Sequence, residues 1–128
     1  MEIIVIPSYR EGGLNEIVHP KFGRCDSFTF ITLENNDVSQ VKVIENSAAD
    51  ESHGSGTLAA KIIGKNNADK LIISKLGANA SMAIDSLKIK TYKAPDKKML
   101  VKDLLALYLK GTLKLTPSEN LIFGKELD

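Results

Sequence analysis

The sequence predicts an α/β fold in which a mixed five-stranded sheet carries helices on both faces. The first 44 residues contain three short runs of β-branched and aromatic residues, two of them separated by a four-residue polar turn. From residue 57 onward the pattern changes to helical stripes that alternate with short apolar runs. A hairpin followed by such crossovers requires antiparallel and parallel strand pairs in one sheet.

The first part of the chain is predicted to be all strand. EIIVI at 2–6 is a continuous β-branched run, typical of a strand buried on both faces. A long polar loop over residues 8–26 follows it. SFTFITL at 27–33 and VSQVKVI at 38–44 flank the polar turn and therefore predict a hairpin.

Helices and strands alternate in the second part of the chain. We predict a helix at 57–67, a buried strand at 69–75, a helix that opens at Gly77, an edge strand at 89–92 flanked by lysines, and a helix within 99–110. The order of elements is therefore β-β-β-α-β-α-β-α. Residues 112–128 show no clear pattern and are predicted to form an irregular C-terminal tail.

Length and composition favour one domain over residues 1–128 and exclude several classes of protein. A single cysteine cannot form an intramolecular disulfide, and the apolar runs are shorter than the roughly 20 residues that span a membrane. A net charge of +1 argues against a dedicated nucleic-acid-binding protein, so the lysine-rich stretch 88–102 is interpreted as a solvated edge. We expect a cytoplasmic protein with neither a membrane nor a nucleic-acid partner.

The glycine-rich loop SHGSGT at 52–57 leads directly into the first predicted helix. Gly54 and Gly56 allow the backbone to approach a ligand closely. The first amides of a helix lack intrahelical partners and carry partial positive charge, so this loop could hold an anion. A helix capped by Ser52 or Ser55 explains the same pattern equally well.

The second loop of interest is HPKFGRC, at 19–25. Imidazole and thiolate are ligands for iron and copper, so His19, Cys25 and His53 are candidate ligands. Arg24 would favour a Cys25 thiolate and neutralise an anionic ligand. One cysteine cannot supply four thiolates, and there is no C-x-x-C pair, so neither an ordinary resident iron–sulfur cluster nor a structural zinc site is expected. Each histidine, taken singly, fits a surface role better than a ligand role.

The residues indicate no catalytic machinery. A Ser–His or Cys–His pair needs a third group that orients the base, and no spacing identifies one. A two-metal centre needs several convergent carboxylates, whereas the interior of the first strand, at 3–6, is entirely aliphatic. We therefore expect a protein that is not an enzyme.

Taken together, these segments resemble the dinitrogenase iron–molybdenum cofactor biosynthesis family, which includes NifX and the C-terminal domain of NifB. The resemblance spans residues 2–111 and rests on Phe22-Gly23-Arg24, Asn46, the glycines at 54 and 56, and the turn at 76–80. It implies a ribonuclease-H-like fold and a non-catalytic carrier or scaffold for an anionic iron–molybdenum or iron–sulfur cluster, bound transiently. The site residues on this hypothesis are His19, Phe22, Gly23, Arg24, Asn46, Gly54 and Gly56 around the cluster, with Cys25 and His53 as metal ligands.

The resemblance also implies proteins that donate or accept the cluster as partners. The sequence departs from the family pattern, because the loop before the first helix is short with one histidine and there is no radical-SAM cysteine motif. Two alternatives stay open: an interaction or regulatory domain that no longer binds a cluster, and a phosphate- or nucleotide-binding module.

Chain topology makes one geometric prediction. The loop at 19–25 leads into the second strand, and the loop at 52–57 follows the third strand, its antiparallel partner. Antiparallel pairing should bring the two loops together at one end of the sheet, where both should be open to solvent.

Overall fold

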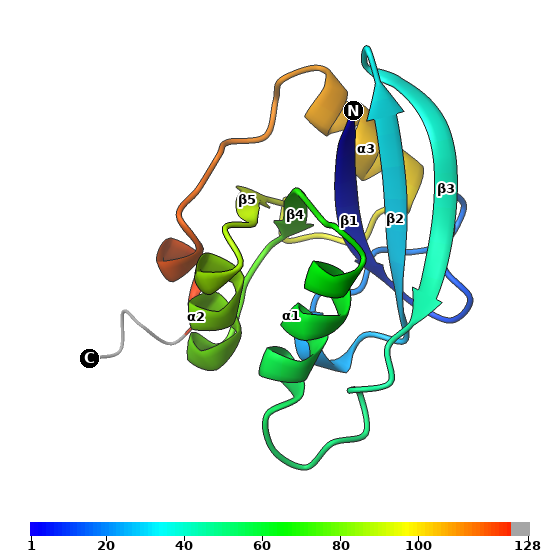
Figure 1. Ribbon diagram of the computed structural model, residues 1–128. Helices are drawn as coiled ribbons and strands as arrows, with labels where there is room; N and C mark the ends of the chain where they lie inside the picture. The colour runs from blue at the N-terminus through cyan, green and yellow to red at the C-terminus, as the bar shows by residue number, and fades with distance from the viewer. Residues whose placement is uncertain (124–128) are drawn as a thin grey trace.

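Figure 1 shows the computed structural model of the protein, which describes residues 1–123. Five strands form one open sheet in the order β3-β2-β1-β4-β5. The central strand β1 (Glu2–Ser8) runs antiparallel to β2 (Ser27–Glu34) and parallel to β4 (Lys70–Ile73). The edges are β3 (Asp37–Glu45) and β5 (Lys90–Lys93). The predicted mixed five-stranded sheet is confirmed, whereas the ribonuclease-H-like label stays a prediction.

The predicted hairpin is formed by β2 and β3, which pair from Ser27 opposite Glu45 to Glu34 opposite Asp37. Its tight turn holds Asn35 and Asn36 at φ values of 53° and 67°. Asparagine tolerates this left-handed region better than most residues, and two such residues match the twist of an antiparallel pair.

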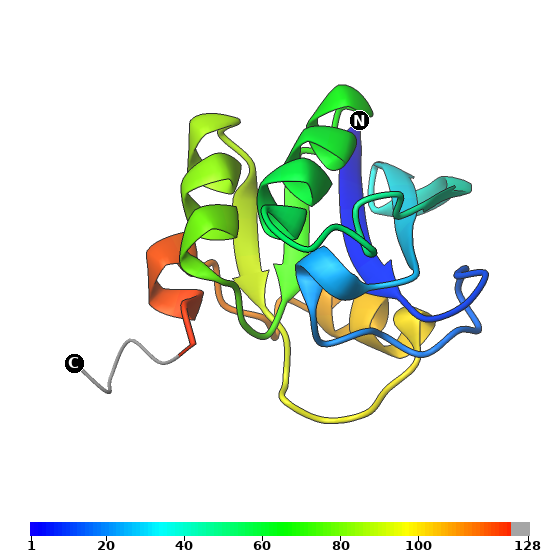
Figure 2. The same ribbon diagram turned by 90° about the horizontal axis from the view of Figure 1, so that it is seen from below.

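Three helices cover the two faces of the sheet, as predicted. Helices α1 (Ser55–Lys65) and α2 (Ala78–Ser86) lie side by side on one face, and α3 (Val101–Leu109) lies on the other (Figure 2). These bounds agree with the expected ranges to within a few residues, as is usual for helix ends.

The aliphatic run of β1 explains why both faces must be covered. Val5 packs with Phe28 and Ile63 beneath α1 and α2, while Ile4 packs with Leu104 on the α3 side. All five of these side chains are fully buried. Each such side chain contributes roughly 1.5–3 kcal/mol of burial free energy, so the sheet is stabilised from both sides.

The C-terminal part is more ordered than an irregular tail. Residues 118–121 form a short 3-10 helix, η2 (Ser118–Leu121), beside α2. Leu115 bridges to Tyr92 of β5, and Ile122 bridges to Leu76. The rest of the predicted tail, 124–128, lies outside the described residues. Within residues 1–123, no helix is long and apolar enough to cross a membrane.

Candidate functional site

The two loops singled out in the sequence meet at one end of the sheet. The backbone amide of Asn46, just after β3, donates to the carbonyl of Asp26, just before β2, at 3.0 Å. The short 3-10 turn η1 (Phe22–Arg24) then lies against the start of α1 (Figure 2). A Cβ atom at Gly23 would lie 2.9 Å from the amide nitrogen of Gly56, so only glycine permits this approach.

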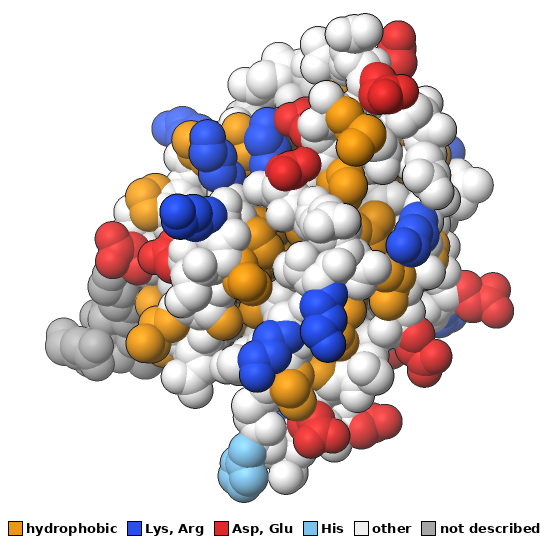
Figure 3. Space-filling model, in the orientation of Figure 1, with side chains coloured by type: hydrophobic (Ala, Val, Ile, Leu, Met, Phe, Trp, Pro, Cys, Tyr) orange, Lys and Arg blue, Asp and Glu red, His pale blue; other side chains and the backbone are white. Residues whose placement is uncertain are grey.

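The start of α2 joins the same place. A Cβ atom at Gly56 would lie 2.9 Å from the Cβ of Ala80, in the first turn of α2. The N-terminus of α1 therefore touches both the N-terminus of α2 and the turn η1. In the space-filling view, apolar side chains lie at the surface where α1 and α2 run side by side, with lysine and arginine side chains on either side (Figure 3).

A cavity of about 650 Å³ lies where these three segments converge, and we call it the anion pocket. Its walls are residues 20–24, 54–56, 75–80 and Phe123. The charged side chains along these walls are Lys21, Arg24 and Lys75, and none of the described lining residues is acidic. The pocket is therefore positively charged, with an apolar component from Phe22 and Leu76.

Backbone amides add to this positive potential. Both helices begin after a glycine, Gly54 and Gly77, and neither glycine position supplies a side-chain cap. Among residues 1–123, the amide nitrogens of 55–57 and 78–80 find no hydrogen-bond acceptor. In α3, by contrast, the carbonyls of Glu16 and Leu14 accept from the first two amides.

The capping alternative for the glycine-rich loop is therefore not supported. Gly54 has φ of 75°, a left-handed conformation that suits glycine, and no side chain caps the helix after it. Neither Ser52 nor Ser55 acts as the N-cap. The six amides of the two helix N-termini are instead left for a ligand or solvent.

Cys25 does not belong to the pocket, and the expectation of an accessible thiol is wrong. Its side chain is fully buried in the core with Phe22 and Phe28. The Sγ atom donates to the carbonyl of Phe22 at 3.3 Å, and Asn46 Nδ2 lies 3.6 Å from it. Burial raises the pKa of the Cys25 thiol to about 12, opposite to the expected activation. A buried, protonated thiol is a poor metal ligand.

Arg24 and Asn46 position the loops. The Arg24 guanidinium donates to the carbonyls of Ala49 and Glu51, at 2.8 and 2.6 Å, and still lines the pocket. Asn46 is buried, and its Nδ2 donates to the carbonyls of Gly23 and Cys25, at 3.2 and 2.9 Å. Asn46 thus ties the turn η1 to the end of β3 and does not line the pocket.

The two histidines lie apart from the anion pocket. His53 is exposed in the loop before α1 and does not line the pocket. His19 faces a neighbouring cavity of about 480 Å³, where its ring lies 4.3 Å from that of Tyr9. Partial burial lowers the pKa of His19, and its Nδ1 accepts from the amide of Lys21 at 3.0 Å.

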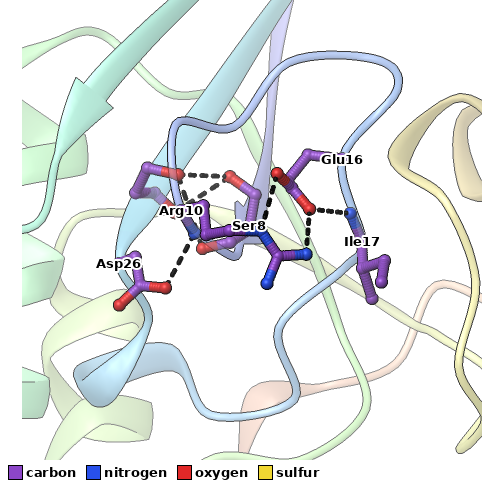
Figure 4. Close-up of polar contacts among 6 residues, drawn as sticks. Ser8, Arg10, Glu16, Ile17 and Asp26 are labelled. Atoms are coloured by element: carbon purple, nitrogen blue, oxygen red, sulfur yellow. Dashed lines mark hydrogen bonds and ion pairs between the residues drawn. The ribbon is translucent and has the colours of Figure 1, made fainter.

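The loop after β1 is braced by its own polar contacts (Figure 4). Asp26 accepts from the Arg10 amide at 2.7 Å, and Glu16 accepts from the Arg10 guanidinium at 2.8 Å and from the Ile17 amide at 2.9 Å. These donors lower the pKa of Glu16, the Ile17 amide most. Ser8 lies beneath, bonded to other buried hydroxyls. Asp26 and Glu16 therefore serve to hold this loop in place. Residues 1–123 contain no group of three or more His, Cys, Asp or Glu placed to hold a metal ion.

The structure thus brings together Phe22, Gly23, Arg24, Gly54 and Gly56 from the expected site and leaves out His19, Cys25, Asn46 and His53. Sequence reasoning missed Lys21, Lys75, Gly77 and Phe123 as lining residues. For Gly77 a signal was present, because a glycine directly before a predicted helix leaves its first amides uncapped.

Comparisons with known proteins agree with this architecture. The family model described as dinitrogenase iron-molybdenum cofactor matches residues 2–111. An uncharacterized protein of Methanocaldococcus jannaschii is 31% identical over 100 residues, which cover 78% of this chain and 83% of that protein. The apo form of the orange protein from Desulfovibrio gigas superposes with a TM-score of 0.81 at 24% identity, over 92% of this chain and 95% of that chain. A Thermotoga structure assigned to NifB gives a TM-score of 0.74 at 26% identity, over 90% and 93%.

Proposed function

Because the chain belongs to the dinitrogenase iron–molybdenum cofactor family, we propose that it binds an anionic metal–sulfur cluster in the anion pocket as a non-catalytic carrier or scaffold. The observation that carries this proposal is the set of six unpaired amides at the starts of α1 and α2. Five of them belong to residues that line the cavity, and the charged lining residues within 1–123 are all cationic. Sulfide and thiolate-bearing clusters are acceptors for such N–H groups, and their negative charge matches the pocket.

The same donor set argues for transient binding. The described residues of the pocket include no thiolate, imidazole or carboxylate, so the protein would hold the cluster by hydrogen bonds and charge and not by direct coordination to metal. A cluster bound in this way keeps its coordination positions open for a donor or acceptor protein. This arrangement suits delivery of a cluster better than permanent storage or catalysis.

Gly77 offers a direct test of the pocket. Its φ and ψ are −76° and 162°, which any residue adopts, and a Cβ atom there would meet open space. An aspartate is also a favourable N-cap, so Gly77→Asp should fold at least as stably as the wild type. It would nevertheless place a carboxylate among the amides that the cluster needs. We expect cluster affinity to fall about tenfold or more.

The experiment is an anaerobic titration with a synthetic 4Fe–4S thiolate cluster and with isolated iron–molybdenum cofactor, followed by gel filtration and metal analysis. Gly77→Asn is the matched control, because it adds nearly the same side chain without the charge. Equal affinity of Gly77→Asp and Gly77→Asn would contradict binding at this site.

Uncapped helix amides also suit phosphate, which keeps the phosphate-binding alternative as a second candidate. Competition separates the two. Inorganic phosphate that displaces the cluster at micromolar concentration would favour the phosphate module. A wild-type protein that binds neither ligand would favour an interaction domain that has no cluster.

A further inference from the structure

The chain beyond α3 forms an arm, residues 112–123, that crosses the outer edge of the sheet to reach the anion pocket. The Lys93 amide donates to the carbonyl of Lys114, and the Thr116 amide donates to the carbonyl of Thr91, at 3.1 and 2.9 Å. Figure 2 shows the arm continuing to η2, beside α2. The match to the family model ends at residue 111, so the arm lies outside the matched part of the chain.

The far end of the arm is attached by hydrogen bonds to α2 and to Leu76, in the segment that forms one wall of the pocket. Ser118 is buried, and its hydroxyl bonds to Ser81 Oγ at 2.9 Å and to Asp85 Oδ1 at 3.0 Å. Leu121 is 3% exposed, and its carbonyl accepts from the Leu76 amide at 2.8 Å.

The next contact fixes the side chain at the rim. The Phe123 amide donates back to the Leu76 carbonyl at 3.2 Å. Because Leu76 itself lines the pocket, these two bonds hold Phe123 beside Gly77 and the first amides of α2. The Phe123 side chain lines the pocket while remaining 64% exposed. A large apolar side chain is thus kept exposed to solvent at the rim of a polar, cationic cavity.

We propose that Phe123 is a specificity-determining residue that makes the anion pocket favour sulfide-faced anions over oxyanions; this inference rests on the proposed function. Charge and amide donors alone do not distinguish a metal–sulfur cluster from phosphate or sulfate. Sulfur is polarizable and makes favourable contacts with aromatic rings. Phosphate oxygens, in contrast, are strongly hydrated and lose water contacts beside an apolar ring without compensation. The amides and cations attract any anion, and the Phe123 ring on the arm adds a preference for sulfur.

The test compares two ligands on two variants of the full chain. Phe123→Ala removes the ring, and because the side chain is mostly exposed the fold should be unaffected. Leu115→Ala is the matched control, because Leu115 is an apolar residue of the same arm, 57% exposed, that does not line the pocket. Each protein is titrated anaerobically with a synthetic 4Fe–4S thiolate cluster and, separately, with inorganic phosphate.

We expect Phe123→Ala to bind the cluster about two- to tenfold more weakly than the wild type, with phosphate affinity unchanged or increased. Leu115→Ala should match the wild type for both ligands. A second readout uses Phe123→Trp, which introduces the only tryptophan of the chain. Its fluorescence should change on cluster binding and much less on addition of phosphate.

The outcomes are separable. Equal cluster affinity of the wild type and Phe123→Ala, or an equal loss for cluster and phosphate, would overturn the role of Phe123 and leave the proposed function standing. A wild-type protein that binds no cluster would overturn both.

Discussion

Gly56 and Ala80 are in direct contact, and this contact joins the first turns of α1 and α2. The space for a Cβ atom at Gly56 is already taken by the Ala80 methyl group, which would be 2.9 Å away. The close approach of the two helix N-termini, and with it the shape of the anion pocket, depends on the absence of one side chain.

Gly56→Ala should therefore destabilise the protein, although alanine is normally the better helix former. Overpacking of this kind costs about 1–3 kcal/mol of unfolding free energy. In the Gly56→Ala background, Ala80→Gly should recover part of this loss, whereas in the wild type it should cost up to about 1 kcal/mol. Urea unfolding of the four proteins gives the coupling energy. Additive effects of the two substitutions would contradict the contact.

Cys25 should behave as a core residue. With the pKa of its buried thiol at about 12, we expect a thiol reagent at pH 8 to modify the native protein very slowly and the urea-unfolded protein rapidly. Rapid modification of the native protein would show that the sulfur is accessible, and Cys25 would again be a candidate metal ligand.

The same pKa predicts a loss of stability in alkali. Since the pKa of Cys25 is raised from 9.0 in the unfolded reference to about 12, the folded state holds this proton more tightly. The resulting stabilisation is complete below pH 9 and declines as the pH rises toward 12, by at most about 1.4 kcal/mol per pH unit. Burial also raises the pKa of Tyr108, so Cys25 is not the only group whose ionisation affects stability in alkali. The measurement is therefore the difference between wild type and Cys25→Ala, which should shrink above pH 9.

Arg24 should have two separable roles. Its guanidinium tethers the loop 46–51 through two carbonyls and also contributes charge to the pocket. Arg24→Gln should increase amide hydrogen exchange and proteolysis in this loop and weaken cluster binding. Lys21→Gln, which removes another pocket charge with no tether, should weaken binding alone. Equal loosening of the loop in both variants would contradict the tethering role.

The sequence by itself determined most of the secondary structure, because those signals are local. The β-branched run at 2–6, the hairpin turn at 34–37 and the apolar stripe of α3 each reflect the residues of one segment. The meeting of the two loops could also be predicted, since antiparallel pairing of β2 and β3 necessarily joins their adjoining ends. Glycines at 54 and 56 indicated a close approach, although their partners were unknown.

Tertiary structure alone decided which of the neighbouring side chains face the pocket. Cys25 follows an exposed arginine in a polar loop, and no local pattern indicates that its sulfur turns inward to pack on Phe28. Phe123 lies 100 residues along the chain from Gly23, and only the folding of the arm across β5 and α2 places both at one cavity. Local sequence patterns specify which residues form a helix or a strand, whereas the direction of a loop side chain and contacts between distant segments depend on the packing of the whole fold.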